Sequence, residues 1–496
     1  MNRIEDSVIH VARFTLEART ALSIGTGGPD GVYDHPIVRD ANGLGSIPGT
    51  SLAGVLRHLW LADQGRASAE ALFGYQRRDR GEGSRLEVAA CVLQDSQGRP
   101  AEGLLCDRDG EERLREDALL CAARATREDP QFRDRVRLTH RGVADHRGKF
   151  DRGVLAAGHR FSGELRLWSR TLDGPEWERL LALLADPRLR LGGATRAGLG
   201  AVSLVDLHCG HFDLRQARQA ADFCGLGHSL GDHRGLTRRA PATLAPGDAA
   251  RVLRIRLTPD DFWRIGQGDR PYGRYDKEPD LLPKAEPVVR WEQGRAAVGL
   301  RLPLVPGASV KGALAHRTAF HWNVLNGHFV EDLSPADLAA WDKSEHCEGV
   351  RRVFGHAKDG DGRTRAASGQ AGHLLIDDVH VEIPAARLGE HVQAMIHNSL
   401  DRFTGGVRGR MLFTEELLYG VPIELGITLL PGLAAAEASD RRALALALRD
   451  LCEGHLALGG GTTKGHGGFT GTPDDAARTW LAAQGVTLNP LQEDAA

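Results

Sequence analysis

The stretch PGTSLAG at residues 48–54 decides how this chain is organised, because it returns as PGASVKG at residues 306–312. A glycine-rich stretch, GGATRAGLG at residues 192–200, returns in the same way as GGGTTKGHG at residues 459–467. The two pairs occur in the same order and are separated by nearly equal lengths of chain. Repeats of this kind indicate a duplicated unit, so the sequence predicts two similar domains with small insertions.

Length, charge and cysteine content agree with two ordinary domains. The chain has 496 residues, which exceeds the usual size of one hydrophobic core. Its formal net charge of −3 gives no general attraction to nucleic acid, so an anion site must be a local patch. The seven cysteines form no CxxC pair, the chain starts with acidic residues, and no apolar stretch is long enough for a bilayer. We therefore expect a cytoplasmic protein without disulfides or membrane contacts.

Hydrophobic spacing predicts the same elements in both halves. Residues 11–19 alternate apolar and polar side chains, which predicts a half-buried strand, and Leu52, Val55, Leu56 and Leu59 follow at helical spacing. The resulting βαββαβ order predicts an α+β fold with two tandem ferredoxin-like or RRM-like domains and long loops. The remaining expected elements are strands at 86–93, 161–168, 202–204, 253–257 and 374–382, and helices at 175–186, after Pro306 and at 440–453.

Composition places the domain boundaries. Residues 206–249 are rich in Gly, His, Asp and Pro, which is typical of a linker. The predicted division is a first domain over 1–205, a linker over 206–249, a second domain over 250–475 and a C-terminal tail over 476–496.

The repeated loops are candidate phosphate sites. A Pro-Gly-x-Ser turn that opens a helix offers free backbone N–H groups and a hydroxyl, and a glycine loop lets the backbone approach a phosphate closely. A tight turn packed on the sheet is the alternative interpretation. Residues of these loops and helices that could contact a nucleic-acid backbone are Ser51, Arg57, Thr195, Arg196, Ser309, Lys311, Arg317, Thr463 and Lys464.

A basic stretch over residues 124–160 adds a second candidate surface. It holds ten Lys and Arg residues against five Asp and Glu residues. A solvated charged loop is the alternative interpretation, since such runs are common. The candidate contacts are Arg137, Arg141, Arg147 and Lys149, together with Arg77 and Arg78 from a smaller basic run.

Further blocks carry a family resemblance. The first half has DHPIVRD at residues 34–40 before its PGTS turn, then Phe73-Gly74 and SRL at 84–86; the second half has Phe354-Gly355, DRFTGG at 401–406 and LFTEE at 412–416. In this order, and with both glycine loops, the blocks resemble the RAMP superfamily of CRISPR-associated proteins. The specific resemblance is to backbone subunits of type III effector complexes.

The resemblance implies a fold, partners and a location. It implies RRM-like domains with inserted thumb hairpins in a prokaryotic cytoplasm. Such subunits line up along a guide crRNA, hold its phosphates and leave its bases free to pair with a complementary target RNA. Other type III effector subunits are further expected partners. Arg39, Arg290, Arg402 and Arg408 lie in or near the family blocks and are expected to contact RNA.

The resemblance also implies a catalytic acid. In members that cut target RNA, the Asp two residues before the Pro of the Asp-x-Pro block is required, and that position is Asp34. A carboxylate can assist attack by the RNA 2′-hydroxyl, and Mg²⁺ or Mn²⁺ is the expected cofactor. The matching second-half residue is Ala285, so Glu286 beside it is the second candidate, and the acidic run over 276–280 is an alternative.

Other interpretations stay open from the sequence. The chain could bind guide RNA without cutting, process guides with His35 or His58 as a metal-independent endoribonuclease, or be a general two-domain RNA-binding protein. The low aromatic content of 5% fits the last of these poorly. A weak zinc pattern is formed by His208, Cys209, His211, His228 and His233.

Overall fold

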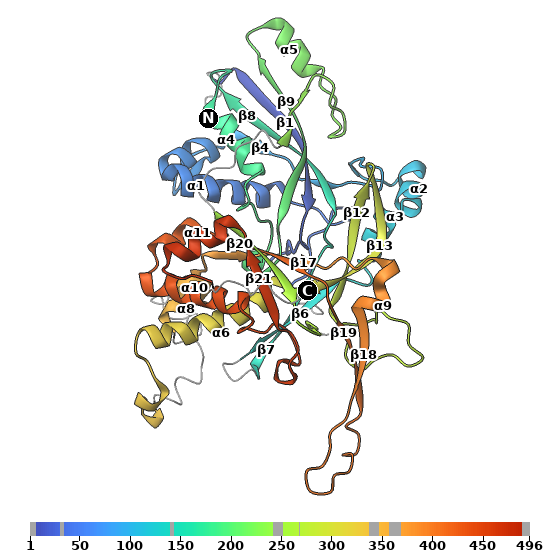
Figure 1. Cartoon of the computed structure of the whole chain (residues 1–496). Coiled ribbons are helices and arrows are strands. Elements are labelled where there is room, and N and C mark those ends of the chain that lie inside the picture. Colours follow the sequence, from blue (N-terminus) through green and yellow to red (C-terminus); the bar gives the residue numbers. More distant parts are fainter. Residues whose placement is uncertain are drawn as a thin grey trace.

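The two halves of the chain form two sheet-and-helix units that pack against each other. Figure 1 shows the first half, in blue and green, above the second half, in yellow to red. The structure is a computed structural model and describes residues 6–29, 34–138, 143–241, 251–266, 268–336, 347–356 and 369–488. Among these residues no helix has the length and apolar character needed to cross a membrane. All seven cysteines are free, as the sequence predicts.

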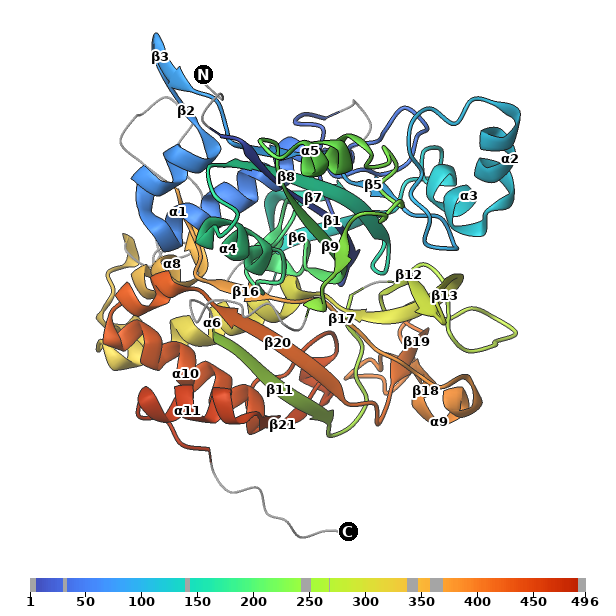
Figure 2. The same cartoon turned by 90° about the horizontal axis from the view of Figure 1, so that it is seen from above.

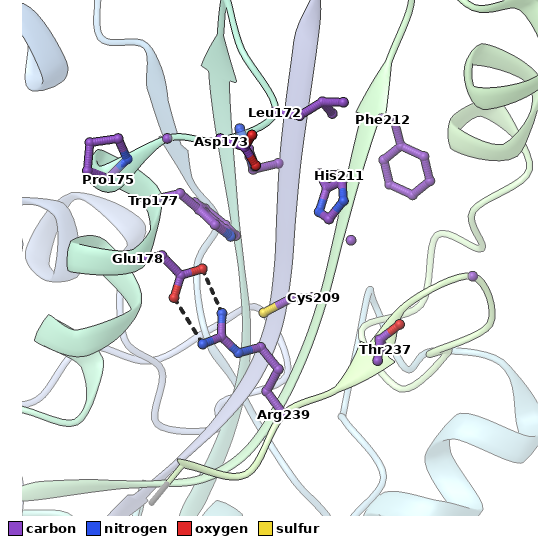
Figure 3. A pocket seen from close by; sticks show the side chains of 14 residues that line it. Leu172, Asp173, Pro175, Trp177, Glu178, Cys209, His211, Phe212, Thr237 and Arg239 are labelled. Atoms are coloured by element: carbon purple, nitrogen blue, oxygen red, sulfur yellow. Dashed lines mark hydrogen bonds and ion pairs between the residues drawn. The ribbon is translucent and has the colours of Figure 1, made fainter. Parts of the chain in front are cut away.

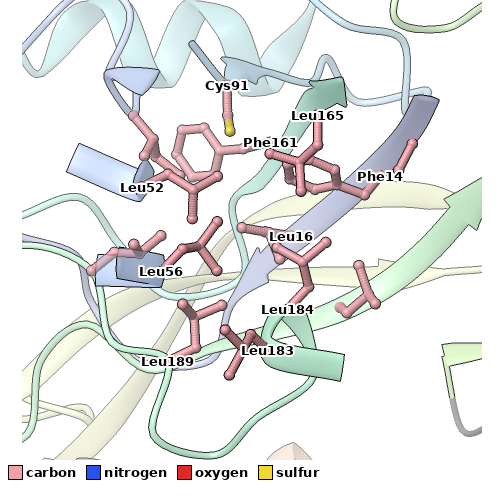
Figure 4. Packing of buried hydrophobic residues seen from close by; sticks show 14 of the residues in the cluster. Phe14, Leu16, Leu52, Leu56, Cys91, Phe161, Leu165, Leu183, Leu184 and Leu189 are labelled. Atoms are coloured by element: carbon pink, nitrogen blue, oxygen red, sulfur yellow. The ribbon is translucent and has the colours of Figure 1, made fainter. Parts of the chain in front are cut away.

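The first half is built on an antiparallel sheet with the order β10–β9–β1–β8–β4, and β5 also pairs with β8. Without β10 and β5, the order β9–β1–β8–β4 is the strand order that a βαββαβ pattern predicts. The main elements are β1 (Val8–Ala18), α1 (Gly49–Phe73), β4 (Leu86–Val88), β5 (Val92–Leu93), β8 (Arg160–Ser169), α4 (Pro175–Leu184), β9 (Val202–Asp213) and β10 (Thr237–Arg238). Figure 4 shows the core in which apolar side chains from β1, β8, α1 and α4 meet.

The second half repeats this arrangement. Its four-stranded antiparallel sheet has the order β16–β20–β11–β21. The elements are β11 (Arg251–Pro259), α6 (Gly307–Leu325), β16 (Leu374–Ile376), β20 (Ile423–Leu429), α10 (Ala438–Cys452) and β21 (Phe469–Pro473). Leu253, Ile255 and Leu257 alternate along β11 and are buried in a core of their own. Each half therefore has the independent core that a duplicated unit requires.

Smaller elements fill the insertions. Among the described residues, the first half adds two hairpins and three helices, and the second half adds three antiparallel strand pairs, three helices and one short strand. They are β2 (Tyr75–Arg77), β3 (Arg80–Glu82), α2 (Arg108–Glu116), α3 (Ala118–Ala125), β6 (Phe132–Leu138), β7 (Ala144–Gly153), α5 (Ala217–Cys224), β12 (Ala285–Glu292), β13 (Arg295–Val305), α8 (Glu348–Phe354), β14 (Gly355–His356), β15 (Gln370–Ala371), β17 (Val379–His380), α9 (Leu388–His391), β18 (Val392–His397), β19 (Phe413–Leu418) and α11 (Asp475–Ala483).

The first sheet is covered on both faces, so the prediction of a half-buried strand over residues 11–19 is wrong. Every residue of β1 except Glu17 is buried. One face packs on α1 and α4, while the other face is covered by the segment that follows β9. Leu236 of that segment packs against the cluster that contains Val11. The polar residues of the strand are buried because a segment about two hundred positions away in the sequence lies over them.

The predicted linker over residues 206–249 is therefore wrong in its first part. β9 continues to Asp213 and pairs with β10. Arg13, which is only 1% exposed, forms an ion pair with Glu164 at 2.7 Å and donates to the backbone oxygen of Gly227 at 2.6 Å. Because a buried guanidinium needs all its donors satisfied, these bonds hold the covering segment on the sheet.

The predicted C-terminal tail over 476–496 is also wrong in its first part. Asp474 caps α11 by accepting a hydrogen bond from the backbone N–H of Ala477 at 2.8 Å. Trp480 and Leu481 on this helix are buried in the core of the second half. The helix is thus part of the second domain, because its apolar face packs into the core of that domain.

Two hairpins cross the boundary between the halves (Figures 1 and 2). From the first half, β6–β7 brings Arg133 to the second half, where it donates to both oxygens of Glu286 at 2.6 and 2.5 Å and to Asp378 at 2.5 Å. From the second half, β12–β13 brings Trp291 to the first half, where its indole N–H donates to the carbonyl of Gly158 at 2.7 Å. The reciprocal contacts fix the halves relative to each other.

A further hairpin, β18–β19, extends away from both sheets, at the bottom of Figure 1. The chain between its strands carries large apolar side chains that the rest of the molecule does not cover. Phe403 is 97% exposed, and Leu400 and Leu412 are exposed as well.

Replacing Arg133 tests the junction. We expect Arg133→Met to lower the free energy of unfolding by about 3–5 kcal/mol, because two buried carboxylates then lose their counter-charge. Lys149→Met is the matched control, since its ion pair with Asp134, at 3.4 Å, is exposed and is expected to contribute less than ~1 kcal/mol. Urea denaturation followed by fluorescence measures both. Equal midpoints for the two variants would contradict the assignment.

Candidate nucleic-acid interface

The two glycine loops pack in the same way in both halves. The N–H of Gly193 donates to the carbonyl of Ser23 at 2.7 Å, and the N–H of Gly460 donates to that of Arg264 at 2.8 Å. In each loop the preceding glycine has a positive φ, and a Cβ there would lie 2.3 Å from the same carbonyl oxygen. Close backbone packing thus explains the repeated Gly-Gly pair, while the rest of each loop is left for other contacts.

The same frame of hydrogen bonds aligns the segment that carries Asp34. The N–H of Gly153, at the end of β7, donates to the carbonyl of His35 at 2.9 Å. In the second half, the N–H of Glu416 on β19 donates to the carbonyl of Leu281 at 2.9 Å. The residue before His35 is Asp34 and the residue before Leu281 is Asp280. These backbone hydrogen bonds therefore make Asp280 the structural counterpart of Asp34.

Both acids are held in the same manner. Oδ2 of Asp34 accepts a hydrogen bond from the N–H of Asp151 at 3.2 Å, and Oδ2 of Asp280 accepts one from the N–H of Thr414 at 2.8 Å. Asp34 and Asp280 are both exposed. Each half thus presents one solvent-facing carboxylate at the base of its outer hairpin.

The match of Asp34 with Ala285 is wrong. Ala285 and Glu286 lie in β12, the strand that packs on the first half. Glu286 is 7% exposed, and the guanidinium of Arg133 keeps the pKa of its carboxyl below the usual value although burial alone would raise it. Its contacts are those of a structural ion pair. The acidic run over 276–280 contains the residue at the equivalent position.

The first acid site has donors suited to a divalent metal. Asp34 and Asp151 each accept the backbone N–H of the other, at 3.2 and 3.0 Å, so two carboxylates lie together. Carboxylate oxygens are the ligands that Mg²⁺ and Mn²⁺ prefer. In the second half Thr414 takes the place of Asp151, so that site has one carboxylate fewer.

Three cations meet where the first glycine loop contacts the second half. Arg135 on β6 donates to the carbonyl of Ala197 at 2.9 Å, and Arg196 donates to that of Gly372 at 2.6 Å. Lys311 lies on the first turns of α6. Burial lowers the pKa of Arg135 to about 10, and burial followed by the charges of Arg196 and Arg135 lowers the pKa of Lys311. Within the described residues none of the three forms an ion pair. The nearby carboxylates of Asp378 and Glu286 are shared with Arg133, so the whole group keeps a net positive charge.

The start of α6 does not offer the free N–H groups that the sequence predicts. The N–H of Gly307 donates to Oδ1 of Asp378 at 2.8 Å, so a carboxylate of the protein already occupies this position. A Cβ on Gly49, at the start of α1, would lie 2.2 Å from the carbonyl of Val88, which shows that this turn packs on the sheet. Tight packing is thus the better interpretation of both Pro-Gly turns, although Ser309 is exposed and Ser51 is half-buried.

Several predicted RNA contacts already have partners. Arg39 donates to the carbonyl of Thr126 at 2.7 Å, and Lys464 lies 4.8 Å from the ring centroid of Phe413. The ion pairs are Arg77 with Glu70, Lys149 with Asp134, Arg290 with Glu382, Arg317 with Asp450 and Lys464 with Glu415.

The other predicted contacts are exposed or lie outside the description. Thr195 is half-buried in the first glycine loop. Arg57, Arg78, Arg137, Arg402, Arg408 and Thr463 are exposed. Arg141 lies outside the described residues, as does the side chain of Arg147.

The sequence did not identify three residues of the candidate interface, because only the β6–β7 hairpin brings them there. Asp151, Arg135 and Arg152 all lie on β6–β7, and the predicted basic stretch contained them without distinguishing them. Burial lowers the pKa of Arg152, which lies against the first glycine loop, where one of its guanidinium nitrogens would be 2.5 Å from a Cβ on Gly193. The alternation of Arg133, Arg135 and Arg137 was the one available signal that this strand has a charged face.

A separate cavity of about 720 Å³ lies between α4 and β9 (Figure 3). Its walls include Trp177, Cys209 and His211, and its two facing charges, Glu178 and Arg239, neutralise each other in a bidentate pair at 2.8 and 2.9 Å. Because it presents no free cation among the described residues, this cavity does not suit a polyanionic backbone.

Comparison with known proteins agrees with the duplication. The sequence profile described as the RAMP superfamily matches the chain twice, over residues 15–203 and 261–470. No curated protein matches the chain. The two matched regions contain both glycine loops and both acid-bearing segments, but they leave out β11 and most of β9. Membership of this superfamily indicates a CRISPR-associated role in RNA binding. From its two matched regions, the chain belongs to the RAMP superfamily.

Proposed function

We propose that this chain is a tandem backbone subunit of a type III CRISPR effector complex that binds guide crRNA and cuts the target RNA paired with it. The observation that carries the proposal is the repeated hydrogen-bond frame that holds Asp34 and Asp280 at equivalent exposed positions. A subunit that cuts at two points along one RNA needs one acid site in each half, and this frame supplies the position for both.

The cation cluster supports RNA binding at the junction. Arg135, Arg196 and Lys311 come from a crossing hairpin, a glycine loop and a helix start, so a phosphodiester chain that follows the junction meets all three. Their positive charges are only partly hydrated, and a phosphate supplies the counter-charge that the protein does not. Base pairing then selects the target, while the protein contacts the backbone.

The chemistry follows from RNA itself. The 2′-oxygen forms a bond to the neighbouring phosphorus while the bond from phosphorus to the 5′-oxygen breaks. The 2′-proton passes to a base and the leaving 5′-oxygen takes a proton from water, which gives a 2′,3′-cyclic phosphate and a 5′-hydroxyl. Asp34 and Asp280 are the carboxylates placed to accept that proton or to hold the group that does. A bound Mg²⁺ or Mn²⁺ supplies charge neutralisation at the phosphate. The N–H groups of Asp151 and Thr414 keep the two acids in fixed orientations.

A guide-binding subunit without cleavage is the second candidate. The observation that favours it is that both acids are exposed and already accept a backbone hydrogen bond, which is also the arrangement of a capped loop. Neutralising either acid is expected to slow a cut if this chain cleaves RNA, and to leave cutting unchanged if the chain only binds the guide.

Neutralising each acid separately tests the cleavage assignment. In the assembled complex with Mg²⁺ or Mn²⁺, we expect Asp34→Asn and Asp280→Asn each to slow one specific cut by at least ~100-fold, because a positioned proton acceptor is lost. The other cut and guide binding should persist. Asp276→Asn is the matched control, since this acid is exposed in the same loop as Asp280. Cut positions and rates are read from end-labelled target RNA on gels.

The outcomes separate the candidates. Loss of one cut in Asp34→Asn alone would leave the second half as a binding module. Unchanged cutting in both variants would overturn the catalytic assignment and favour the guide-binding subunit.

Removing junction cations tests the RNA path. We expect Arg196→Met and Lys311→Met each to weaken crRNA binding about 5–10-fold and to reduce the slope of log affinity against log salt by ~0.7, since each removes one phosphate contact. Arg77→Met is the control, because Glu70 already pairs with its guanidinium at 2.6 Å. Fluorescence anisotropy over a salt series measures both quantities. An unchanged salt slope in all three variants would place the RNA elsewhere.

A further inference from the structure

The outer face of the first sheet carries a cluster of three possible metal ligands. Asp206 and His208 lie on β9, two residues apart, and His233 lies in the segment that covers this face. One ligand atom of each residue lies within 4.8 Å of the others. The residues therefore join a strand to the segment over it, a connection that their spacing in the sequence does not reveal.

The distances suit a tetrahedral ion. Nδ1 of His208 lies 3.4 Å from Oδ2 of Asp206. Two ligands bound to Zn²⁺ at the usual lengths are about 3.3–3.4 Å apart in tetrahedral geometry. The rings of His208 and His233 are stacked with centroids 3.8 Å apart, so one ring turns out of the stack when both bind one ion.

Each imidazole presents a ring nitrogen without a hydrogen bond. Nδ1 of His208 and Nδ1 of His233 are both buried and have no hydrogen-bond partner among the described residues. An unpartnered buried ring nitrogen costs free energy unless a ligand takes it up.

The surrounding charges leave Asp206 available. Arg238 contacts only Oδ1 of Asp206, at 3.1 Å, while Oδ2 faces His208. Arg13, the nearest buried cation, is paired with Glu164 at 2.7 Å, and Asp232 is paired with Arg234.

We propose that Asp206, His208 and His233 bind one Zn²⁺ ion that fastens the covering segment, residues 225–236, to β9. Two imidazoles and one carboxylate leave a fourth position for water. The segment already packs on the sheet through the half-buried Leu226 and Leu236 and through the hydrogen bond from Arg13 to Gly227, and the ion adds a direct link between the segment and β9. The site is separate from the acid loops and from the junction cations, and it stands or falls independently of the RNA proposal.

The other three residues of the predicted zinc pattern lie outside this cluster, and one of them, His228, is exposed. Cys209 and His211 line the cavity between β9 and α4 (Figure 3), on the opposite side of the strand from His208. His211 is exposed. It therefore provides a control that changes a histidine on the same strand without touching the proposed ligands.

Zinc content and zinc-dependent stability test the site. The tag-free full chain is stripped with a chelator, given one equivalent of Zn²⁺, passed through gel filtration and measured by elemental analysis, and the melting temperature is recorded with and without the metal. We expect about one zinc per chain and a higher melting temperature for wild type and His211→Ala, with loss of both effects in His208→Ala and His233→Ala. When Co²⁺ is supplied instead of Zn²⁺, we expect the visible absorption of a tetrahedral site in wild type and His211→Ala. We expect no such absorption in His208→Ala and His233→Ala.

Controls keep the result decisive. His233→Ala changes a half-buried loop residue, so its far-ultraviolet circular dichroism should match that of metal-free wild type even if His208→Ala unfolds. Substoichiometric zinc in wild type, or equal zinc in wild type and His233→Ala, would overturn the proposal. A metal that is retained but has no effect on the melting temperature would overturn the fastening role.

Discussion

A single buried cluster of charges determines how the two halves meet. Arg133, 3% exposed, reaches from the first half and satisfies Glu286 and one oxygen of Asp378. The other oxygen of Asp378 accepts the N–H of Gly307 at the start of α6. One carboxylate thus joins a hairpin of one half to a helix of the other. Arg135 follows two residues later on β6, and this anchoring places it near Lys311. The positive patch at the junction depends on an ion cluster that does not itself face solvent.

Duplication has preserved the backbone frame while the charges on it have diverged. The residues just before the equivalent N–H donors Gly153 and Glu416 are Arg152 and Glu415. Arg152 adds a cation at the base of the first outer hairpin. Glu415, in contrast, is 2% exposed and forms ion pairs with Arg264 at 3.4 Å and with Lys464 at 3.8 Å, so its charge is neutralised within the chain. The equivalent acids Asp34 and Asp280 therefore lie in different electrostatic surroundings.

Local patterns in the sequence predict most of the sheets and helices, because alternation and helical spacing depend on neighbours along the chain. They fail at Arg13, whose position on an alternating strand predicts exposure, since a distant segment covers it. They fail again at Glu286. Aligning the two halves residue by residue matches Asp34 with Ala285, because such an alignment does not account for the insertions that make Asp280 the equivalent residue. Arg196 and Lys311 could be predicted from their motifs. Arg135 could not be separated from Arg133 and Arg137, because only contacts with the other half distinguish them.

The outward hairpin β18–β19 gives the molecule two unlike ends. The base of the first half's hairpin is anchored on the second half through Arg133, whereas the second half's hairpin projects away from both sheets with Phe403 uncovered. If this projection docks on a different surface of an identical neighbour, the contact is heterologous, because the neighbour does not return it through the same surface. Copies joined through it would all point one way, and the resulting array would have a start and an end. The asymmetry of the single chain thus sets the direction of such an array.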